Sequence, residues 1–252
     1  MGDFWNEDGV KANREGIIQT NKEVGKLFAR AYRYIKAAAA IYEDTSVINS
    51  WAIDRRGVNA EAKAIINNLF GNFEVANKEG KQRKLFASAI TPDGYKNYLN
   101  SILTTKTIYS IMGEHGTGTE ALLEKILRAS VEAGYNTECY YCALFPEKLE
   151  HIVIPGLEVS FTTVNDYHAG AAKDSIEVNL NKYLDSNLIN NYKETIEYNK
   201  SQFDDLMNKA IETIGRAKKL HDYMESFYIP NMDFEAVQRC LESTMARILE
   251  YE

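Results

Sequence analysis

The sequence predicts an α/β fold with a mostly parallel sheet and long helical segments on both sides of it in the sequence. Three observations predict this class. Residues from about 84 to 180 alternate short apolar runs with amphipathic helical runs. One apolar run leads into a glycine-rich loop, and long amphipathic stretches without proline flank the region. We therefore divide the chain into a helical segment 1–80, an α/β core 81–180 and a helical segment 181–252.

The first helical segment contains a long run from about Asn13 to Asp44 and a shorter amphipathic run over 60–70. Apolar residues of the long run recur at steps of three, four or seven, which places them on one face of a helix. They are Ile17, Val24, Leu27, Ala31, Ile35, Ala38 and Ile41.

The second helical segment repeats this organisation, with a long run from about Leu188 to Phe227 and a shorter run over 233–251 that Asp233 could cap. The two segments align at a shift of about 179 residues, with Phe4-Trp5 against Tyr183-Leu184. We therefore expect an internal repeat, and two long helices that lie side by side because neither is stable alone in water.

Between the two copies, five runs are typical of strands: 85–90, 107–112, 138–144, 152–154 and 159–164. Two amphipathic runs, 95–103 and 120–133, are typical of helices. This alternation favours a three-layer core in which helices cover both faces of the sheet.

Composition narrows the functional classes. The chain has 252 residues and a net charge of −7, which disfavours a general nucleic-acid binder. The one basic cluster, Lys78, Lys81, Arg83 and Lys84, fits a solvated linker. No apolar run is long enough to cross a membrane, and the stretch Met1 to Asn6 lacks the basic and apolar regions of a signal peptide. We therefore expect no membrane partner and a cytoplasmic location.

The cysteines and histidines give no metal site. Cys139 and Cys142 form a C-x-x-C within a strand-like run, where residues three apart point to opposite faces. We interpret them as core thiols. No second cysteine pair or closely spaced histidine pair accompanies them, so a zinc site is not predicted.

The feature that carries chemistry is the loop Gly113 to Glu120, which follows the strand 107–112 and precedes a helix. Its glycines fall where a Walker A loop needs them, so that backbone amides can approach phosphate oxygens. The helix N-terminus adds its own N–H groups. Candidate binding residues for a nucleotide or another anion are Gly113, His115, Gly116, Thr117, Gly118, Thr119 and Glu120.

Two chemical positions of a Walker A loop are replaced. Thr119 stands where a lysine would contact the β- and γ-phosphates, and Glu120 stands where a hydroxyl would ligate Mg²⁺. Three interpretations stay open: a structural turn, weak nucleotide or anion binding, and catalysis with a cation recruited from Lys106 or Arg128. No catalytic residue, metal ligand or resident cofactor is assigned, and bound ATP with Mg²⁺ remains an alternative.

Several stretches together resemble a bacterial family of tandem P-loop ATPase-like, or nucleotide kinase-like, proteins. They are 85–94, 108–118, Tyr141-Cys142, 152–155, Asn179-Leu180 and 220–222. The resemblance covers the whole chain and implies a P-loop NTPase-like core. Family members carry two halves, each a P-loop core with a helical insertion, which would explain the repeat.

By that comparison the chain corresponds to the second half plus the helical insertion of the first, and it lacks the first P-loop core. The candidate partners are then a separate first-half polypeptide or a second copy of the chain. The acidic residue of a Walker B-like position is Thr163 here, with Asp166 as a substitute. Asp166, Tyr167 and His168 are further candidates to line a site, because they follow a strand. For His115 we expect a solvent-exposed ring.

Our leading hypothesis is a degenerate P-loop NTPase-like protein with little or no ATP hydrolysis. One alternative is an active ATPase or nucleotide kinase-like enzyme. Another is a structural or partner-binding module, for example in a homo-oligomer.

Overall fold

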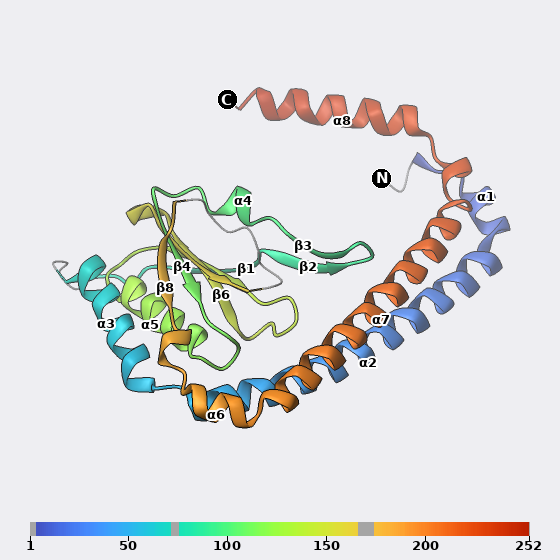
Figure 1. Cartoon of the computed structure of the whole chain (residues 1–252). Coiled ribbons are helices and arrows are strands. Elements are labelled where there is room, and N and C mark those ends of the chain that lie inside the picture. Colours follow the sequence, from blue (N-terminus) through green and yellow to red (C-terminus); the bar gives the residue numbers. More distant parts are fainter. Residues whose placement is uncertain (1–3, 72–75, 166–173, 252) are drawn as a thin grey trace. The chain divides into compact units, whose positions relative to one another are not determined.

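The computed structural model describes residues 4–71, 76–165 and 174–251. The chain divides into two compact units, one of residues 34–209 and one that joins residues 1–33 to 210–252. Figure 1 shows the chain and its elements. Each unit is described by itself.

The unit of residues 34–209 contains a six-stranded sheet. Five strands share one direction and only the third in order, β6, runs against its neighbours β5 and β7. The prediction of an α/β core with a mostly parallel sheet is confirmed. In spatial order the strands are β1 (Gln82–Phe86), β5 (Thr137–Tyr141), β6 (Leu149–Ile154), β7 (Val159–Val164), β4 (Thr107–Met112) and β8 (Ile176–Asn179).

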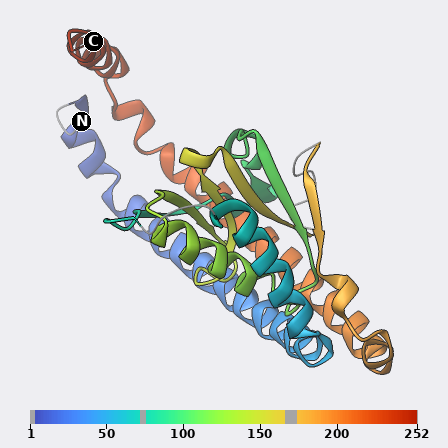
Figure 2. The same cartoon turned by 90° about the vertical axis from the view of Figure 1, so that its left-hand side faces the viewer.

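One face of this sheet carries the main hydrophobic core. Helices α5 (Thr119–Glu132) and α3 (Arg55–Phe70) pack side by side on it, as Figure 2 shows. Ile152 and Phe161 point from the strands into this core, and both are fully buried. Burial of apolar side chains between the sheet and two helices is the main term that stabilises this layer.

On the opposite face, the structure differs from the three-layer prediction. The cluster there is small, with Tyr140 and Val153 from the sheet and Leu99 from the four-residue helix α4 (Leu99–Ile102). The cause is the antiparallel strand β6, because antiparallel neighbours are joined by short connections without crossover helices. Fewer helices are then available to cover the second face.

The predicted helix over 95–103 is wrong in its first part. Gly94–Asn97 forms strand β3, which pairs with β2 (Ser88–Thr91) in a separate antiparallel hairpin. Gly94 has a φ of 95°, the left-handed conformation that glycine tolerates at a tight turn. The chain can therefore reverse at Gly94 before α4 begins.

The long helices are α2 (Arg14–Ala52) and α7 (Lys193–Glu225), preceded by the short helices α1 (Glu7–Ala12) and α6 (Ser186–Asn191). Within the unit of residues 34–209, Ala38 of α2 packs against Phe203 and Met207 of α7. These helix segments therefore lie against one another, as expected.

In the unit of residues 1–33 and 210–252, α8 (Phe234–Leu249) follows α7 after the short 3₁₀ turn Ile229–Asn231. Asp233 caps α8, because its Oδ1 accepts the N–H of Ala236 at 2.9 Å. This confirms the predicted cap. Among the described helices, none is both long enough and apolar enough to span a membrane.

Candidate functional site

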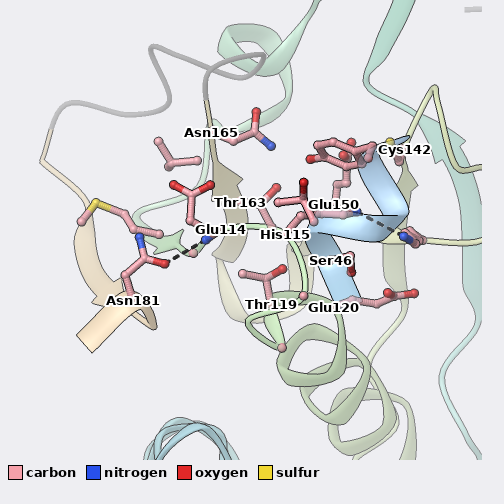
Figure 3. A pocket seen from close by; sticks show the side chains of 18 of the residues that line it. Ser46, Glu114, His115, Thr119, Glu120, Cys142, Glu150, Thr163, Asn165 and Asn181 are labelled. Carbon is pink, nitrogen blue, oxygen red and sulfur yellow. Dashed lines mark hydrogen bonds between the residues drawn. The ribbon is translucent and has the colours of Figure 1, made fainter. Parts of the chain in front are cut away.

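A cavity of about 830 Å³ opens at the carboxyl ends of β4 and β7, within the unit of residues 34–209. The glycine loop and the start of α5 form one wall, and residues of α2 and α7 form another. Figure 3 shows Thr119 and Glu120 at the start of the helix, with Thr163 at the end of its strand. Ligands of open α/β sheets bind at this edge of the sheet.

The loop reaches its shape through two glycines with positive φ. Gly116 has a φ of 84°, and a Cβ there would lie 2.1 Å from the backbone oxygen of Ser46 in α2. Gly118 has a φ of 90° and is the residue before α5. It offers no side chain to cap the helix, so the first-turn N–H groups of α5 stay available to a ligand.

Three contacts hold the loop. The side-chain amide of Asn49 donates to the backbone oxygen of His115 at 2.7 Å. The backbone N–H of Glu114 donates to Oδ1 of Asn181 at 2.9 Å, drawn in Figure 3. The Thr117 hydroxyl donates to the Glu114 oxygen at 2.6 Å, and Thr117 is fully buried. Thr117 therefore stabilises the loop and does not line the cavity.

His115 does not point into solvent, so that prediction is wrong. Its ring lies 3.9 Å from the ring centre of Tyr42, and it stacks on Phe145. Lys148 Nζ lies 3.1 Å from His115 Nε2. An ammonium group only donates, so Nε2 accepts and the ring proton sits on Nδ1. Burial and the positive charge of Lys148 lower the pKa of His115 to about 3, which leaves the ring neutral.

The charges around the cavity are mixed. Three carboxylates line it, those of Glu114, Glu120 and Glu150, together with the ammonium groups of Lys148 and Lys200. Burial raises the pKa of Glu120, and the charge of Lys148 opposes this rise. Burial also raises the pKa of Glu150 to about 7, while its hydrogen bond with the Cys142 thiol and the charge of Lys148 lower it. At neutral pH, Glu150 is therefore partly protonated.

Thr163 provides a polar group that the fold itself leaves without a partner. Its side-chain hydroxyl is buried and forms no hydrogen bond with any residue that the structure describes. Only 7% of the residue is exposed, and it lines the cavity at the end of β7, beside Ile111 of β4. A buried hydroxyl without a partner costs about 1–3 kcal/mol, so a bound ligand could supply the missing contact.

Only some of the residues predicted for the site line the cavity. Gly113, His115, Gly116, Gly118, Thr119 and Glu120 all line the cavity. The proposed substitute cations do not: Lys106 pairs with Glu158 at the opposite end of β4, and Arg128 lies farther along α5 beside Glu124. Asp166, Tyr167 and His168 fall outside the described residues.

Sequence reasoning missed Lys148, Glu150, Asn49 and Asn181. Asn49 lies in α2 and Asn181 follows β8. No local pattern marks them, because each reaches the loop only through the tertiary fold. One signal could have pointed to Lys148, which lies in the connection between β5 and β6, directly before β6. Strand β6 lies beside β7, and β7 lies beside β4, the strand that leads into the glycine loop.

The cysteines are free. Cys139 is buried in the main core, whereas Cys142 lines the cavity, and burial raises the pKa of the Cys142 thiol to about 12. Among the described residues, one group could hold a metal ion, formed by His221, Asp222 and Glu225 on the exposed surface of α7. It lies outside the cavity.

Comparison of the chain with protein-family models, curated proteins and solved structures finds no match in any of the three. The functional argument therefore rests on the site itself.

Proposed function

We propose that the chain is a degenerate P-loop NTPase-like protein that binds a phosphate-bearing ligand in this cavity and hydrolyses ATP little or not at all. The observation that carries the proposal is the strand–loop–helix geometry. Strand β4 leads into a loop with left-handed glycines at 116 and 118, and the uncapped start of α5 faces a large cavity. Successive backbone amides in such a turn form a concavity that binds anions.

Two side chains support ligand binding. Lys148 brings an ammonium group beside the loop that carries Thr119 in the usual lysine position. The Thr163 hydroxyl, nine-tenths buried, gains a hydrogen bond when a ligand oxygen enters. These two groups come from different elements, yet both line the cavity.

Other residues argue against efficient hydrolysis. Phosphoryl transfer depends on a cation at the transferring phosphate, a bound metal and a positioned nucleophile. Glu120 replaces the metal-ligating hydroxyl with a carboxylate. Thr163 occupies the Walker B-like position at the end of β7, where an acidic residue is expected. The carboxylates of Glu114 and Glu120, together with the partly ionised Glu150, offset the two ammonium groups of the cavity. A triphosphate of about four negative charges therefore gains little net attraction. Weak binding without turnover follows.

Titration calorimetry of the whole chain with ATP, ADP and inorganic phosphate, each with and without Mg²⁺, tests this proposal. Gly118→Val should abolish binding, because Gly118 has a φ of 90° and a Cβ there would lie 3.2 Å from Val58. The matched control is Gly94→Val. A valine at position 94 meets similar backbone strain, because Gly94 has a φ of 95°. Gly94 does not line the cavity, so this variant should bind like the wild type.

The outcomes separate the hypotheses. Binding lost only in Gly118→Val supports a phosphate site. No binding of any of the three ligands at millimolar concentration contradicts the proposal and leaves the loop as a structural turn. Mg²⁺-dependent ATP turnover that disappears in Gly118→Val supports the alternative of an active ATPase or kinase-like enzyme.

A further inference from the structure

Helix α7 brings one polar side chain into the cavity between two apolar ones. Ile196, Asn199 and Phe203 of this helix all line the cavity. Their spacing of three and four residues places them on one face of α7. Tyr42 of α2 packs against the same face, with its ring centre 5.0 Å from that of Phe203. The helix face therefore presents a single amide between apolar neighbours.

The Asn199 side chain is held in one orientation. The residue is only 6% exposed. Its Nδ2 donates to Oδ2 of Asp44 at 2.7 Å and to Oγ1 of Thr45 at 3.3 Å. The Asp44 carboxylate only accepts hydrogen bonds, so the nitrogen of the amide must face it. The amide oxygen then points away from Asp44.

This orientation leaves the Asn199 oxygen available to a ligand. Oδ1 has no hydrogen-bond partner among the residues that the structure describes, because both side-chain hydrogen bonds of Asn199 start at its nitrogen. Asn199 is otherwise buried and lines the cavity, so a molecule in the cavity can reach this oxygen. A carbonyl oxygen accepts and cannot donate. The matching group on a ligand is therefore a hydrogen-bond donor.

The amide and the glycine loop lie on different walls of one cavity. The ring of Tyr42 connects these walls, since its centre lies 3.9 Å from that of His115 in the loop and 5.0 Å from that of Phe203. The cavity volume of about 830 Å³ falls in the range of ~300–1,000 Å³ that holds a whole small-molecule ligand. A ligand bound by its phosphate at the loop thus has room to extend to α7.

We propose that the ligand is a phosphate ester that carries a flat ring with an amino group, as AMP and CMP do, and that Asn199 selects it by accepting an N–H of that amino group. The proposal rests on the proposed function, which assigns the phosphate end to the glycine loop. It adds the chemistry of the other end and the residue that reads it.

The neighbours of Asn199 favour a flat ring over other donors. A sugar would bring hydroxyl groups against Ile196 and Phe203, where they find no partner. An alkyl ammonium would be a charge with one acceptor on an apolar helix face, which is costly when water is excluded. An amino-substituted ring instead places apolar faces against these side chains and one polar edge against Oδ1.

The strength of the selection follows from water. Without a ligand, water can donate to Oδ1. A ligand with an amino group displaces this water and replaces its hydrogen bond, whereas the same ligand without the amino group displaces it and leaves the oxygen unpaired. An unpaired buried acceptor lowers affinity, so we expect the amino group to improve binding about tenfold.

Pairs of nucleotides that differ only in the amino group test the proposal on the full chain. Calorimetry compares AMP with purine riboside monophosphate, which is AMP without its amino group, and CMP with its analogue that lacks the amino group. Ribose phosphate and inorganic phosphate report on the phosphate end alone. In at least one pair, the nucleotide with the amino group should bind about tenfold more tightly than its analogue.

Two variants assign this preference to Asn199. Asn199→Leu removes the acceptor at similar side-chain size, so both members of a pair should bind equally. Asp44 is exposed, and Asp44→Ala should fold normally but release the amide, so the preference should decrease. Glu43→Ala is the matched control, because Glu43 is the exposed neighbour of Asp44 and does not line the cavity. It should keep the wild-type preference. Each preference compares two ligands on one protein, so a general loss of stability cancels.

The outcomes distinguish this proposal from the proposed function. Equal affinities within both pairs for the wild type overturn the selection of an amino group. A preference that is unchanged in Asn199→Leu and in Asp44→Ala overturns the role of Asn199. Nucleotides that bind no more tightly than ribose phosphate overturn the proposal and leave the phosphate site intact. No binding of any of these ligands at millimolar concentration contradicts the proposed function and this proposal with it.

Discussion

Lys148 Nζ lies 3.1 Å from Nε2 of His115, and this contact holds an ammonium group beside a glycine loop that has no lysine of its own. The ammonium also lies 4.0 Å from the ring centre of Phe145. The rings of Tyr42, His115 and Phe145 pack against one another and thus support the position of the cation.

Removal of this cation should weaken anion binding. Lys148→Met keeps an unbranched, mostly apolar side chain one atom shorter and deletes the charge, so we expect inorganic phosphate or ATP to bind about five- to tenfold more weakly. Calorimetry at low and high salt measures the change, and salt should affect the variant less than the wild type. Lys106→Met is the matched control at the far end of β4, and an equal loss there would rule out a specific role for Lys148.

The buried hydroxyl of Thr163 predicts opposite effects on stability and binding. Thr163→Val should raise the free energy of unfolding of the unliganded protein by about 1 kcal/mol, because it removes a buried polar group without a partner. The same change should weaken ligand binding. Urea unfolding and calorimetry measure the two effects. A variant that is less stable and binds with unchanged affinity would show that the Thr163 hydroxyl forms no hydrogen bond with a ligand.

Glu150 and His115 predict opposing pH dependences of stability. The folded pKa of Glu150, about 7, lies above its ordinary value of 4.5, so its contribution to stability falls as pH rises from about 4.5 to 7. The folded pKa of His115, about 3, lies below its ordinary value of 6.5, so its contribution falls as pH drops below about 6.5. Between pH 4.5 and 6.5 the two slopes largely cancel.

Glu150→Gln should remove the contribution of Glu150 to the pH dependence of stability and leave that of His115. Relative to the wild type, the variant should gain stability as pH rises, by roughly 3 kcal/mol at pH 8 and by nothing near pH 4. Urea unfolding at pH 4, 6 and 8 gives the comparison. Glu158→Gln, at the opposite end of the sheet, is the control, and a similar pH-dependent gain there would refute the assignment.

Restoring the Walker A chemistry should raise nucleotide affinity if the loop retains its phosphate-binding shape. Thr119→Lys with Glu120→Thr shifts the local charge by two units toward an anionic ligand. At ~5 Å and an effective dielectric near 20, each unit is worth roughly 3 kcal/mol before desolvation and ordering losses. If a third of this free energy remains after those losses, about 1 kcal/mol per unit, the two units together contribute about 2 kcal/mol, which is more than tenfold in affinity. Calorimetry with ATP on the folded variant measures it, and an unchanged affinity would favour a structural turn.

Much of the fold could be predicted because it depends on local periodicity. The strands 107–112 and 159–164 have the predicted bounds, and the long helices were found from one apolar face without proline. The strand β8, of four residues, was not predicted, and the hairpin β2–β3 was only partly identified. Such segments are too short to carry a periodic signal, and their pairing partners decide their structure.

The sequence by itself determined the glycine loop, its place between a strand and a helix, and the replacement of its lysine and hydroxyl, because these features lie within one continuous stretch of the chain. Only the tertiary structure decided which groups face that loop. Asn49, Lys148, Thr163 and Asn181 come from four separate segments of the chain and reach the loop or its cavity by packing of α2 and by the lateral order of the strands. The burial that neutralises His115 and shifts Glu150 likewise depends on side chains distant in sequence, since desolvation is a property of the assembled core.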